Sequence, residues 1–308
     1  MSSQVFVHEA LYYADVDEYL AGAMPFVREG IEAGDPVLVA VPADRHEPMR
    51  DALGRDADRV RFRDMADAGR NPNRIIPWVL QAFMDEHSPR RVRIIGEPIF
   101  VGRTPEEIGP CVQHEALINV AFAGVDAMIL CPYDVVRLSH IMSDAEHTHP
   151  VIVERDGRRR PGDYLDPAAV VNMHNTPLPE PTTVDDAFVF DLPRLGDLRR
   201  VVAHHAVGAG LSAERVADAQ TAVTEIATNA LTHGGPTIAT LRAWSDPGRV
   251  VYEIRGAGKI TDPMAGRIVP PPDVAHGRGL LVANRLCDLI QTHTLLTGTV
   301  TRLHLNRT

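Results

Sequence analysis

Glu225 and Asn229 are the two residues whose types and spacing could do chemistry. They stand four positions apart in the segment 221–235, whose apolar residues recur at helical spacing, so both side chains share one face of a predicted helix. The carboxylate can accept a proton from an attacking hydroxyl group, and the amide oxygen can hold Mg²⁺. The pair therefore suits phosphoryl transfer, although two solvated residues on an amphipathic helix would show the same spacing.

Two glycine segments follow this predicted helix. His233 and the pair Gly234-Gly235 close the helix, because glycine readily takes the left-handed geometry that ends one. After two strand-like runs comes the first glycine segment, Arg255-Gly-Ala-Gly-Lys259. An irregular stretch rich in glycine and proline then leads to the second segment, His276-Gly-Arg-Gly-Leu280, and to a further helix.

This order of motifs resembles the GHKL ATPase module, and within it the anti-sigma-factor serine kinases of bacteria. In that family an asparagine-bearing helix, two glycine boxes and a lid enclose ATP. The resemblance covers residues 186–308 and implies a two-layer α/β sandwich with a mostly antiparallel sheet. It also implies that Glu225 is the general base for a serine or threonine hydroxyl group and that Asn229 coordinates the Mg²⁺ bridging the phosphates. The other nucleotide-binding positions that it implies are His233, Gly256, Gly258, Gly277, Arg278 and Gly279.

The first glycine segment departs from the family pattern. Members carry an aspartate at the position that we align with Arg255, where it accepts a hydrogen bond from the adenine amino group. Arginine has no acceptor, and losing one buried acceptor generally costs about 1–3 kcal/mol. Lys259 also replaces the glycine that ends the box. ATP and Mg²⁺ are the expected cofactors, bound at a site whose base-recognition side is altered.

The N-terminal half alternates strands and helices. Its strands are short, solidly apolar runs, which is typical of parallel strands that are buried on both faces. Thr104-Pro-Glu-Glu107 is a capping box that begins a helix, and residues 135–142 are expected to form the last helix behind the sheet. We therefore predict a three-layer α/β domain, a parallel sheet covered by helices on both faces. The sequence contains no phosphate-binding loop motif in this half.

This half resembles the MEDS sensory domain of bacterial regulators, whose layout is related to RecA-like ATPases that lack the phosphate-binding loop. The resemblance implies sensing but names no ligand. Its landmarks are His8-Glu9, Gly96-Glu-Pro98, His114-Glu-Ala-Leu-Ile-Asn119, Cys131-Pro-Tyr-Asp134 and Thr148-His-Pro150.

Polar residues gather at the predicted strand ends of this half, where open α/β sheets bind their ligands. We expect Glu97, Tyr133 and Asp134 to line a polar small-molecule pocket. Three histidines and a cysteine are of types that suit zinc, but none shows a close-set spacing such as C-x-x-C. Separate buried hydrogen-bonding roles are therefore favoured for His8, His114, Cys131 and His149. The seven residues together make up the predicted sensory pocket.

The bulk properties exclude several classes of protein. With 308 residues the chain is long enough for two domains, and a proline-rich linker, 175–185, separates the predicted sensory domain 1–174 from the GHKL domain 186–308. The formal net charge of −10 argues against direct binding to nucleic acid. Three scattered cysteines suggest no disulfide framework, and neither a secretory signal nor a membrane-spanning run is visible. We expect a cytoplasmic protein that binds no membrane.

The combined expectation is a bacterial transcription regulator. The sensory domain would bind a small molecule and control an anti-sigma domain that switches between two partners, a sigma factor and a small antagonist protein. Serine/threonine protein kinase activity toward the antagonist is a subsidiary expectation, and a homodimer stays open. One alternative is the output module of a sensor histidine kinase, although no dimerisation-helix pair with a phosphoacceptor histidine is predicted. The other is a small-molecule-responsive binding protein without catalysis, which Arg255 favours.

Overall fold

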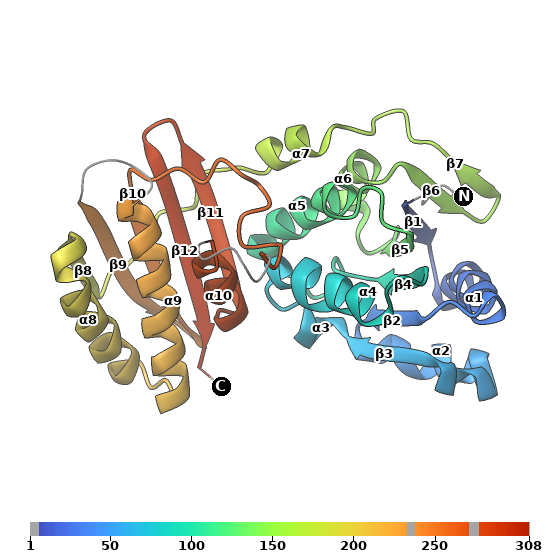
Figure 1. Ribbon diagram of the computed structural model, residues 1–308, viewed down its shortest axis with the longest axis horizontal. Helices are drawn as coiled ribbons and strands as arrows, with labels where there is room; N and C mark the ends of the chain where they lie inside the picture. The colour runs from blue at the N-terminus through green and yellow to red at the C-terminus, as the bar shows by residue number, and fades with distance from the viewer. Residues whose placement is uncertain (1–5, 233–237, 271–276, 308) are drawn as a thin grey trace. The chain divides into compact units, whose positions relative to one another are not determined.

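The computed structural model describes residues 6–232, 238–270 and 277–307 (Figure 1). The chain divides into two compact units, Met1–His174 and Asn175–Thr308. Within the described residues each unit is built on one sheet, seven-stranded in the N-terminal unit and five-stranded in the C-terminal unit.

The N-terminal sheet is parallel except at one edge. Its strand order is β3-β2-β4-β5-β1-β6-β7, and among the described strands β7 alone runs antiparallel to its neighbour. The solid apolar runs at β2 and β4 are buried along their whole length, as strands covered on both faces should be. The strands are β1 (Val7–Tyr13), β2 (Val37–Val41), β3 (Val60–Asp64), β4 (Val92–Gly96), β5 (Ala127–Asp134), β6 (Val151–Glu154) and β7 (Gly157–Arg159).

Helices cover both faces of this sheet, which confirms the predicted three-layer α/β arrangement. On one face, α1 (Val16–Ala33) and α2 (His46–Leu53) share a core cluster with Leu11 and Tyr13 of β1. On the other face lie α5 (Pro105–Ala121) and α6 (Met142–Thr148), and a side chain of α5 reaches His8 of β1. The remaining helices of this unit are α3 (Met65–Ala68), a π-helical segment (Ile76–Gln81), α4 (Ala82–His87) and α7 (Pro167–Met173).

Two local predictions in this unit had different outcomes. The capping box is confirmed, because the Thr104 and Glu107 side chains both cap the first turn of α5. The predicted α-helix at 135–142 is wrong: a turn at 135–138 follows β5, a short 3-10 helix covers Ser139–Ile141, and α6 begins only at Met142. The Asp134 carboxylate accepts hydrogen bonds from the backbone N–H groups of Val136 (3.1 Å) and Arg137 (2.8 Å), and this turn competes with helix formation.

The C-terminal unit is the predicted two-layer sandwich. Its sheet is antiparallel, in the order β11-β12-β10-β9-β8, and its helices α8 (Leu195–Gly208), α9 (Ala213–Thr232) and α10 (Gly279–Leu286) contribute to one core with it. Alternate residues of each strand enter that core. The strands are β8 (Asp186–Phe190), β9 (Ala239–Asp246), β10 (Arg249–Gly256), β11 (Leu289–Leu295) and β12 (Gly298–Asn306).

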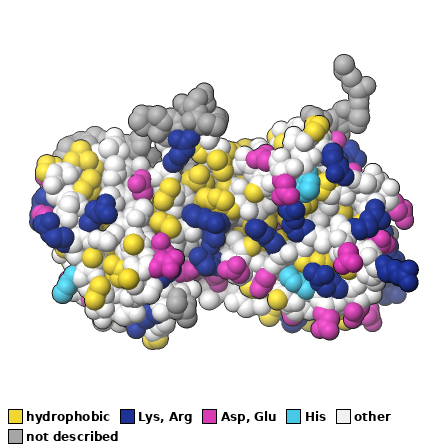
Figure 2. All heavy atoms as spheres, turned by 60° about the horizontal axis from the view of Figure 1, so that its bottom comes forward, with side chains coloured by type: hydrophobic (Ala, Val, Ile, Leu, Met, Phe, Trp, Pro, Cys, Tyr) yellow, Lys and Arg dark blue, Asp and Glu magenta, His cyan; other side chains and the backbone are white. Residues whose placement is uncertain are grey.

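Two surface properties bear on the function. On the face shown in Figure 2, the basic side chains drawn in colour are interspersed with acidic ones and form no continuous basic surface. Among the helices of the described residues, none combines the length and the apolar character that crossing a membrane requires.

Candidate functional site

α9 presents Glu225 and Asn229 at the edge of the C-terminal core. Its buried stripe includes Val223 and Ile226, which pack into the core between the helices and the sheet. Glu225 and Asn229 are only partly buried. Within the described residues, neither side chain makes a hydrogen bond, so both are available to a ligand.

The Glu225 carboxylate lies against the second glycine segment. A Cβ atom on Gly279 would overlap Oε2 of Glu225, so only glycine fits at this position without displacing the carboxylate. Gly279 is the first residue of α10, which places the carboxylate at the N-terminus of that helix. Gly277 has φ of 90°, a left-handed conformation that favours glycine. The two glycines thus bring the start of α10 next to Glu225.

A pocket with a volume of about 460 Å³ opens beside this point. Asn229 lines it together with Gly277 and Gly279, so the amide and the second glycine segment face the same space. Its other polar lining residues are Lys259, Thr261, Asp262, Thr299 and Thr301. Its apolar lining residues are Ile226, Ala230, Ile254, Ile260, Ala265 and Leu280.

The first glycine segment packs directly on the end of α9. A Cβ atom on Gly256 would lie 2.6 Å from Cβ of Ala230, and one on Gly258 would lie 3.0 Å from the backbone oxygen of Asn229. Real Cβ atoms keep larger distances from such neighbours. The two glycines therefore let β10 leave the sheet close to α9, and this close approach shapes the wall of the pocket.

Arg255 does not face the pocket, which corrects the sequence alignment. Its guanidinium group donates hydrogen bonds to Glu253 (2.7 Å) and Glu180 (2.7 Å) on the outer face of the sheet, opposite the helices. Side chains alternate along a strand, so the neighbour that faces the pocket is Ile254. The alternation of Val250, Tyr252 and Ile254 with polar residues was the sequence signal that could have shown this.

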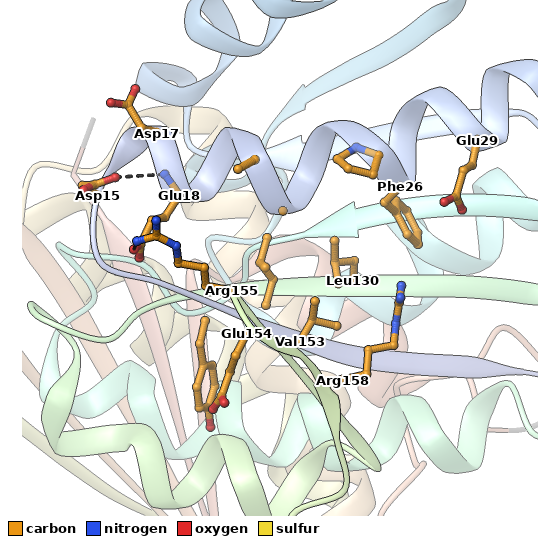
Figure 3. Close-up of a pocket in the computed structure, with 16 residues that line it drawn as sticks. Asp15, Asp17, Glu18, Phe26, Glu29, Leu130, Val153, Glu154, Arg155 and Arg158 are labelled. Atoms are coloured by element: carbon orange, nitrogen blue, oxygen red, sulfur yellow. Dashed lines mark hydrogen bonds and ion pairs between the residues drawn. The ribbon is translucent and has the colours of Figure 1, made fainter.

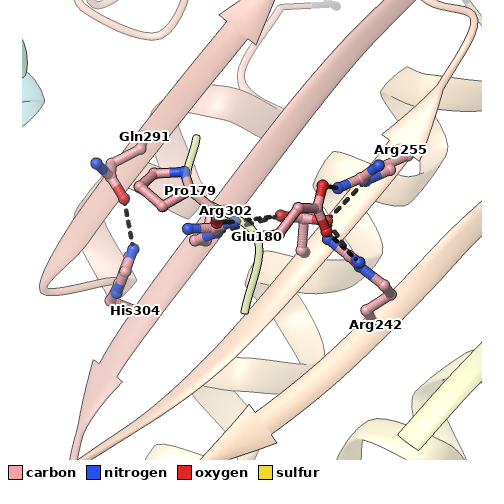
Figure 4. Close-up of polar contacts among 8 residues, drawn as sticks. Pro179, Glu180, Arg242, Arg255, Gln291, Arg302 and His304 are labelled. Atoms are coloured by element: carbon pink, nitrogen blue, oxygen red, sulfur yellow. Dashed lines mark hydrogen bonds and ion pairs between the residues drawn. The ribbon is translucent and has the colours of Figure 1, made fainter. Parts of the chain in front are cut away.

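The outer face of the sheet carries an arginine cluster that holds part of the predicted linker (Figure 4). The fully buried Glu253 carboxylate accepts hydrogen bonds from Arg242, Arg255 and Arg302. Glu180 accepts from Arg242 (2.8 Å) and Arg255 (2.7 Å), and these bonds hold the pKa of Glu180 down at about 2. Arg302 also donates to the backbone oxygen of residue 179 (2.8 Å).

The remaining predicted nucleotide-binding residues have mixed positions. Gly258 and Lys259 line the pocket, and Gly256 forms its closely packed turn. Arg278 directly precedes α10 and is half-buried. The prediction for His233 falls outside the described residues.

The residues present fit Mg²⁺-ATP through its phosphates. Asn229 and Gly279 line the pocket, and the Glu225 carboxylate lies against Gly279 at the N-terminus of α10, where a helix attracts anions. The base side is different, because Ile254 offers no hydrogen-bond acceptor there. The hydroxyl groups of Thr299 and Thr301 are the polar groups that β12 contributes to the lining.

In the N-terminal unit, three of the predicted sensory residues meet in one buried cluster. His8 of β1, Cys131 of β5 and His149 after α6 surround Glu115 of α5, with their ligand atoms within 4.8 Å of one another. The expectation of separate roles is therefore wrong for these three residues. Burial and His149 lower the pKa of His8, whereas burial and the Glu115 carboxylate raise the pKa of Cys131. Glu115 was not predicted as a site residue, although an acidic residue in an apolar stretch of a helix is a sequence signal for a buried carboxylate.

Glu97 belongs to a second buried group, at the carboxyl end of β4. It accepts a hydrogen bond from the Tyr13 hydroxyl group (3.3 Å), which in turn accepts one from Arg45 (3.3 Å). Burial raises the pKa of Glu97 to about 8, and the charge of Arg45 opposes this rise only in part. This carboxyl group is therefore largely protonated at neutral pH.

The other three predicted sensory residues are not members of the cluster around Glu115, although Tyr133 borders it. Asp134 holds its turn and pairs with Arg137 (2.5 Å). The ring of Tyr133 is buried, with its centroid 5.5 Å from that of His149. His114 is buried in α5.

A pocket that the sequence analysis did not predict lies between α1, β6 and β7 (Figure 3). Its volume is about 540 Å³, and its apolar lining includes Phe26, Leu130 and Val153. Acidic side chains of α1 and the arginines Arg155 and Arg158 surround these apolar residues. No local sequence motif predicts this pocket, because it forms only where the β6–β7 hairpin meets α1.

Fold and site together define a two-domain protein whose C-terminal unit is a GHKL-type sandwich with a pocket beside α9 and α10. Comparison with protein families agrees: residues 188–305 match the histidine kinase-like ATPase domain, and residues 7–150 match MEDS, described as the MEthanogen/methylotroph, DcmR Sensory domain. The chain thus carries an N-terminal MEDS domain and a C-terminal histidine kinase-like ATPase domain, and a domain of the second family implies ATP binding. Among curated proteins, none matched.

Two solved structures each resemble part of the chain. One is the crystal structure of the RsbU and RsbW domains of Rv1364c from Mycobacterium tuberculosis, with 18% identity over 39% of this chain and 32% of that chain and a TM-score of 0.29. Another is the Acinetobacter baumannii histidine kinase AdeS, with 12% identity over 40% of this chain and 68% of that chain and a TM-score of 0.24.

Proposed function

We propose that this protein is a bacterial transcription regulator in which the MEDS domain senses a small molecule and the ATPase-type domain acts as an anti-sigma factor. The ATPase-type domain binds either a sigma factor or a small antagonist protein. It phosphorylates a serine or threonine of the antagonist, and phosphorylation decides which partner is bound. The order of motifs in 186–308, which resembles the anti-sigma-factor serine kinases, supports this proposal.

The observation that carries the proposal is the position of Glu225 at the start of α10, beside the pocket that Asn229 lines. The Glu225 carboxylate accepts the proton of the attacking hydroxyl group as the oxygen–phosphorus bond forms. The amide oxygen of Asn229 is a ligand of the kind that Mg²⁺ prefers. Mg²⁺-ATP, when bound, would supply the γ-phosphoryl group with ADP as the leaving group, and its Mg²⁺ would offset the negative charge of the phosphates. The backbone N–H groups at the start of α10 orient the phosphates.

Phosphoryl transfer to a purified antagonist protein tests the proposal. The substrate is an antagonist that co-purifies with the full-length chain, and the product is followed by gel mobility shift and mass spectrometry. Glu225→Gln should lower the transfer rate at least about 100-fold while Mg²⁺-ATP still binds. Glu214→Gln is the matched control, since Glu214 is an exposed carboxylate on the first turn of the same helix. No transfer by the wild type, or equal rates for both variants, would remove the kinase claim.

A second candidate is a small-molecule-responsive binding protein without catalysis, and Ile254 favours it. An apolar side chain at the base edge of the pocket weakens adenine recognition, whatever the phosphate side retains. Calorimetric titration with Mg²⁺-ATP separates the two candidates, because the second predicts no binding at millimolar nucleotide.

The histidine-kinase alternative gains no support from His205, the buried member of the histidine pair in α8. His205 is buried in the sandwich, where its ring nitrogens lie within hydrogen-bond distance of the Tyr252 hydroxyl group (3.4 Å) and Asp185 (3.3 Å). A phosphoacceptor must be accessible to the nucleotide of a kinase domain. His205 therefore has a structural role.

A further inference from the structure

The buried cluster in the MEDS domain has the composition of a metal site. Four potential ligand atoms converge: Nε2 of His8, Oε2 of Glu115, Sγ of Cys131 and Nε2 of His149. All four residues are at least 97% buried, with exposed fractions of 3%, 0%, 1% and 0%. They come from β1, α5, β5 and the end of α6, so no local sequence spacing links them.

The distances between these atoms match the edges of a coordination tetrahedron. Oε2 of Glu115 lies 3.2 Å from His8 Nε2, 3.4 Å from Cys131 Sγ and 3.4 Å from His149 Nε2. Cys131 Sγ lies 3.4 Å from His8 Nε2. With zinc bonds of about 2.0–2.3 Å, neighbouring ligand atoms in a tetrahedron stand about 3.3–3.7 Å apart. Four of the six edges therefore have nearly the required length before any ion is placed.

Hydrogen bonds on the far side of both imidazole rings direct their lone pairs toward this centre. Nδ1 of His8 lies 3.1 Å from Oδ1 of Asn119, whose amide nitrogen donates to the backbone oxygen of Thr148 (2.8 Å) and so fixes the amide orientation. Nδ1 of His149 lies 2.9 Å from the backbone oxygen of Ala145. Both Nδ1 atoms are therefore donors, and in a neutral ring Nε2 is then an acceptor. Metal-binding histidines usually have such a partner on the second nitrogen.

Hydrogen bonds alone satisfy this arrangement poorly. Two neutral rings would point two Nε2 lone pairs at the oxygen lone pairs of Glu115, which repel each other without a cation between them. Two protonated rings would bury two positive charges beside one carboxylate, and buried unpaired charge is costly. One protonated ring would pair with Glu115 but would leave Nε2 of the other ring facing Oε2 with no proton between them. In each of these states three groups crowd around Oε2, whereas Oε1 of Glu115 has no hydrogen-bond partner within the described residues.

We propose that His8, Glu115, Cys131 and His149 bind one Zn²⁺ ion in a closed, four-coordinate site of the MEDS domain. Two imidazole nitrogens, a thiolate and a carboxylate oxygen in tetrahedral arrangement are the ligands and geometry that Zn²⁺ accepts. Binding transfers the Cys131 thiol proton to solvent and leaves the thiolate on the metal. The ion cross-links β1, β5 and α5, so it stabilises the sensory domain or reports on metal supply.

Metal analysis of the full-length protein, purified with a histidine-free tag and without chelators, tests the proposal. Wild type should carry about one Zn²⁺ per chain, and Cys131→Ser should lose at least about tenfold in Zn²⁺ affinity against a chromophoric competitor. Cys111→Ser is the matched control, because Cys111 is also a fully buried cysteine of this domain but lies outside the cluster. It should retain the ion.

Substitution with Co²⁺ gives a spectroscopic readout in the wild type itself, to which the Cys131→Ser variant is then compared. The Co²⁺-loaded wild type should show intense tetrahedral d–d bands and a thiolate charge-transfer band, and Cys131→Ser should lose the charge-transfer band alone. The proposal is overturned if metal-free wild type binds neither Zn²⁺ nor Co²⁺ at micromolar concentrations. It is equally overturned if the two cysteine variants bind Zn²⁺ alike.

Discussion

The Gly256→Ala substitution tests the close contact between the end of β10 and α9 that shapes the pocket. The new Cβ atom would lie 2.6 Å from Cβ of Ala230, 3.1 Å from its backbone oxygen and 3.3 Å from its Cα atom. Carbon atoms in contact stand about 3.5–4.0 Å apart, so roughly 1 Å must be absorbed by backbone that packs in the core. Overpacking of this kind destabilises by about 1–3 kcal/mol. We therefore expect Gly256→Ala to lower the free energy of unfolding by about 2 kcal/mol.

A second substitution tests whether the loss of stability comes from the overlap with Ala230. Ala230→Gly removes the nearest atom but leaves the two backbone contacts, and by itself it costs about 1 kcal/mol in a helix. In the double variant the Gly256→Ala substitution should cost about 1 kcal/mol less than it does alone. Gly196→Ala is the control, because a Cβ atom there meets nothing within 4 Å.

Urea unfolding followed by the fluorescence of Trp244 measures these effects. Trp244 is buried in the C-terminal unit, and Trp78→Phe removes the other tryptophan of the chain. A Gly256→Ala variant as stable as the Gly196→Ala control would refute the close approach. If the two substitutions change the free energy of unfolding by strictly additive amounts in the double variant, Ala230 is not the obstructing residue.

Three further predictions follow from buried and pocket-lining groups. Because burial raises the pKa of Glu97 from 4.5 to about 8, the folded state retains a proton that the unfolded chain releases. The free energy of unfolding of the N-terminal unit should therefore fall by roughly 3–4 kcal/mol between pH 5 and 8. Glu97→Gln should remove this pH dependence in urea unfolding, and an unchanged pH dependence would contradict the prediction. Glu253→Gln should cost about 2–4 kcal/mol of stability because it replaces a buried carboxylate shared by three arginines with a neutral amide. Asp246→Asn, in a partly exposed pair with Arg249, should cost under about 1 kcal/mol. Ile254→Asp should raise the affinity for Mg²⁺-ATP about tenfold in calorimetry by adding an acceptor at the base edge, and unchanged affinity would place the adenine elsewhere.

The sequence was sufficient for the features that depend on local periodicity. Solid apolar strands predicted the fold class of the N-terminal unit, because burial on two faces imposes that pattern. The fold class of the C-terminal unit was expected from the resemblance of its motif order to the GHKL ATPase module. The capping box at Thr104 predicted the start of α5 for the same local reason. The error of aligning Arg255 with the pocket could also have been avoided from local sequence. Side chains alternate between the two faces of a strand, so Ile254, two residues after the core residue Tyr252, also points into the core.

Features that depend on strand register could not be predicted. His8 and Cys131 face one another only because β1 pairs with β5 in the register that places Ala10 beside Cys131. Glu115 and His149 then reach the same point from segments that no spacing rule connects. The docking of Glu180 on the arginine cluster is likewise invisible, because a proline-rich stretch predicts an extended chain but not the surface that it lies on.

Calorimetric titration of the full-length protein with ATP, with and without Mg²⁺, tests the central claim most directly. The account predicts one binding site per chain, Mg²⁺-dependent affinity, and at least about a tenfold loss of that affinity in Asn229→Ala but not in Glu214→Gln. No detectable binding at millimolar Mg²⁺-ATP, or equal affinities for the wild type and Asn229→Ala, would contradict it.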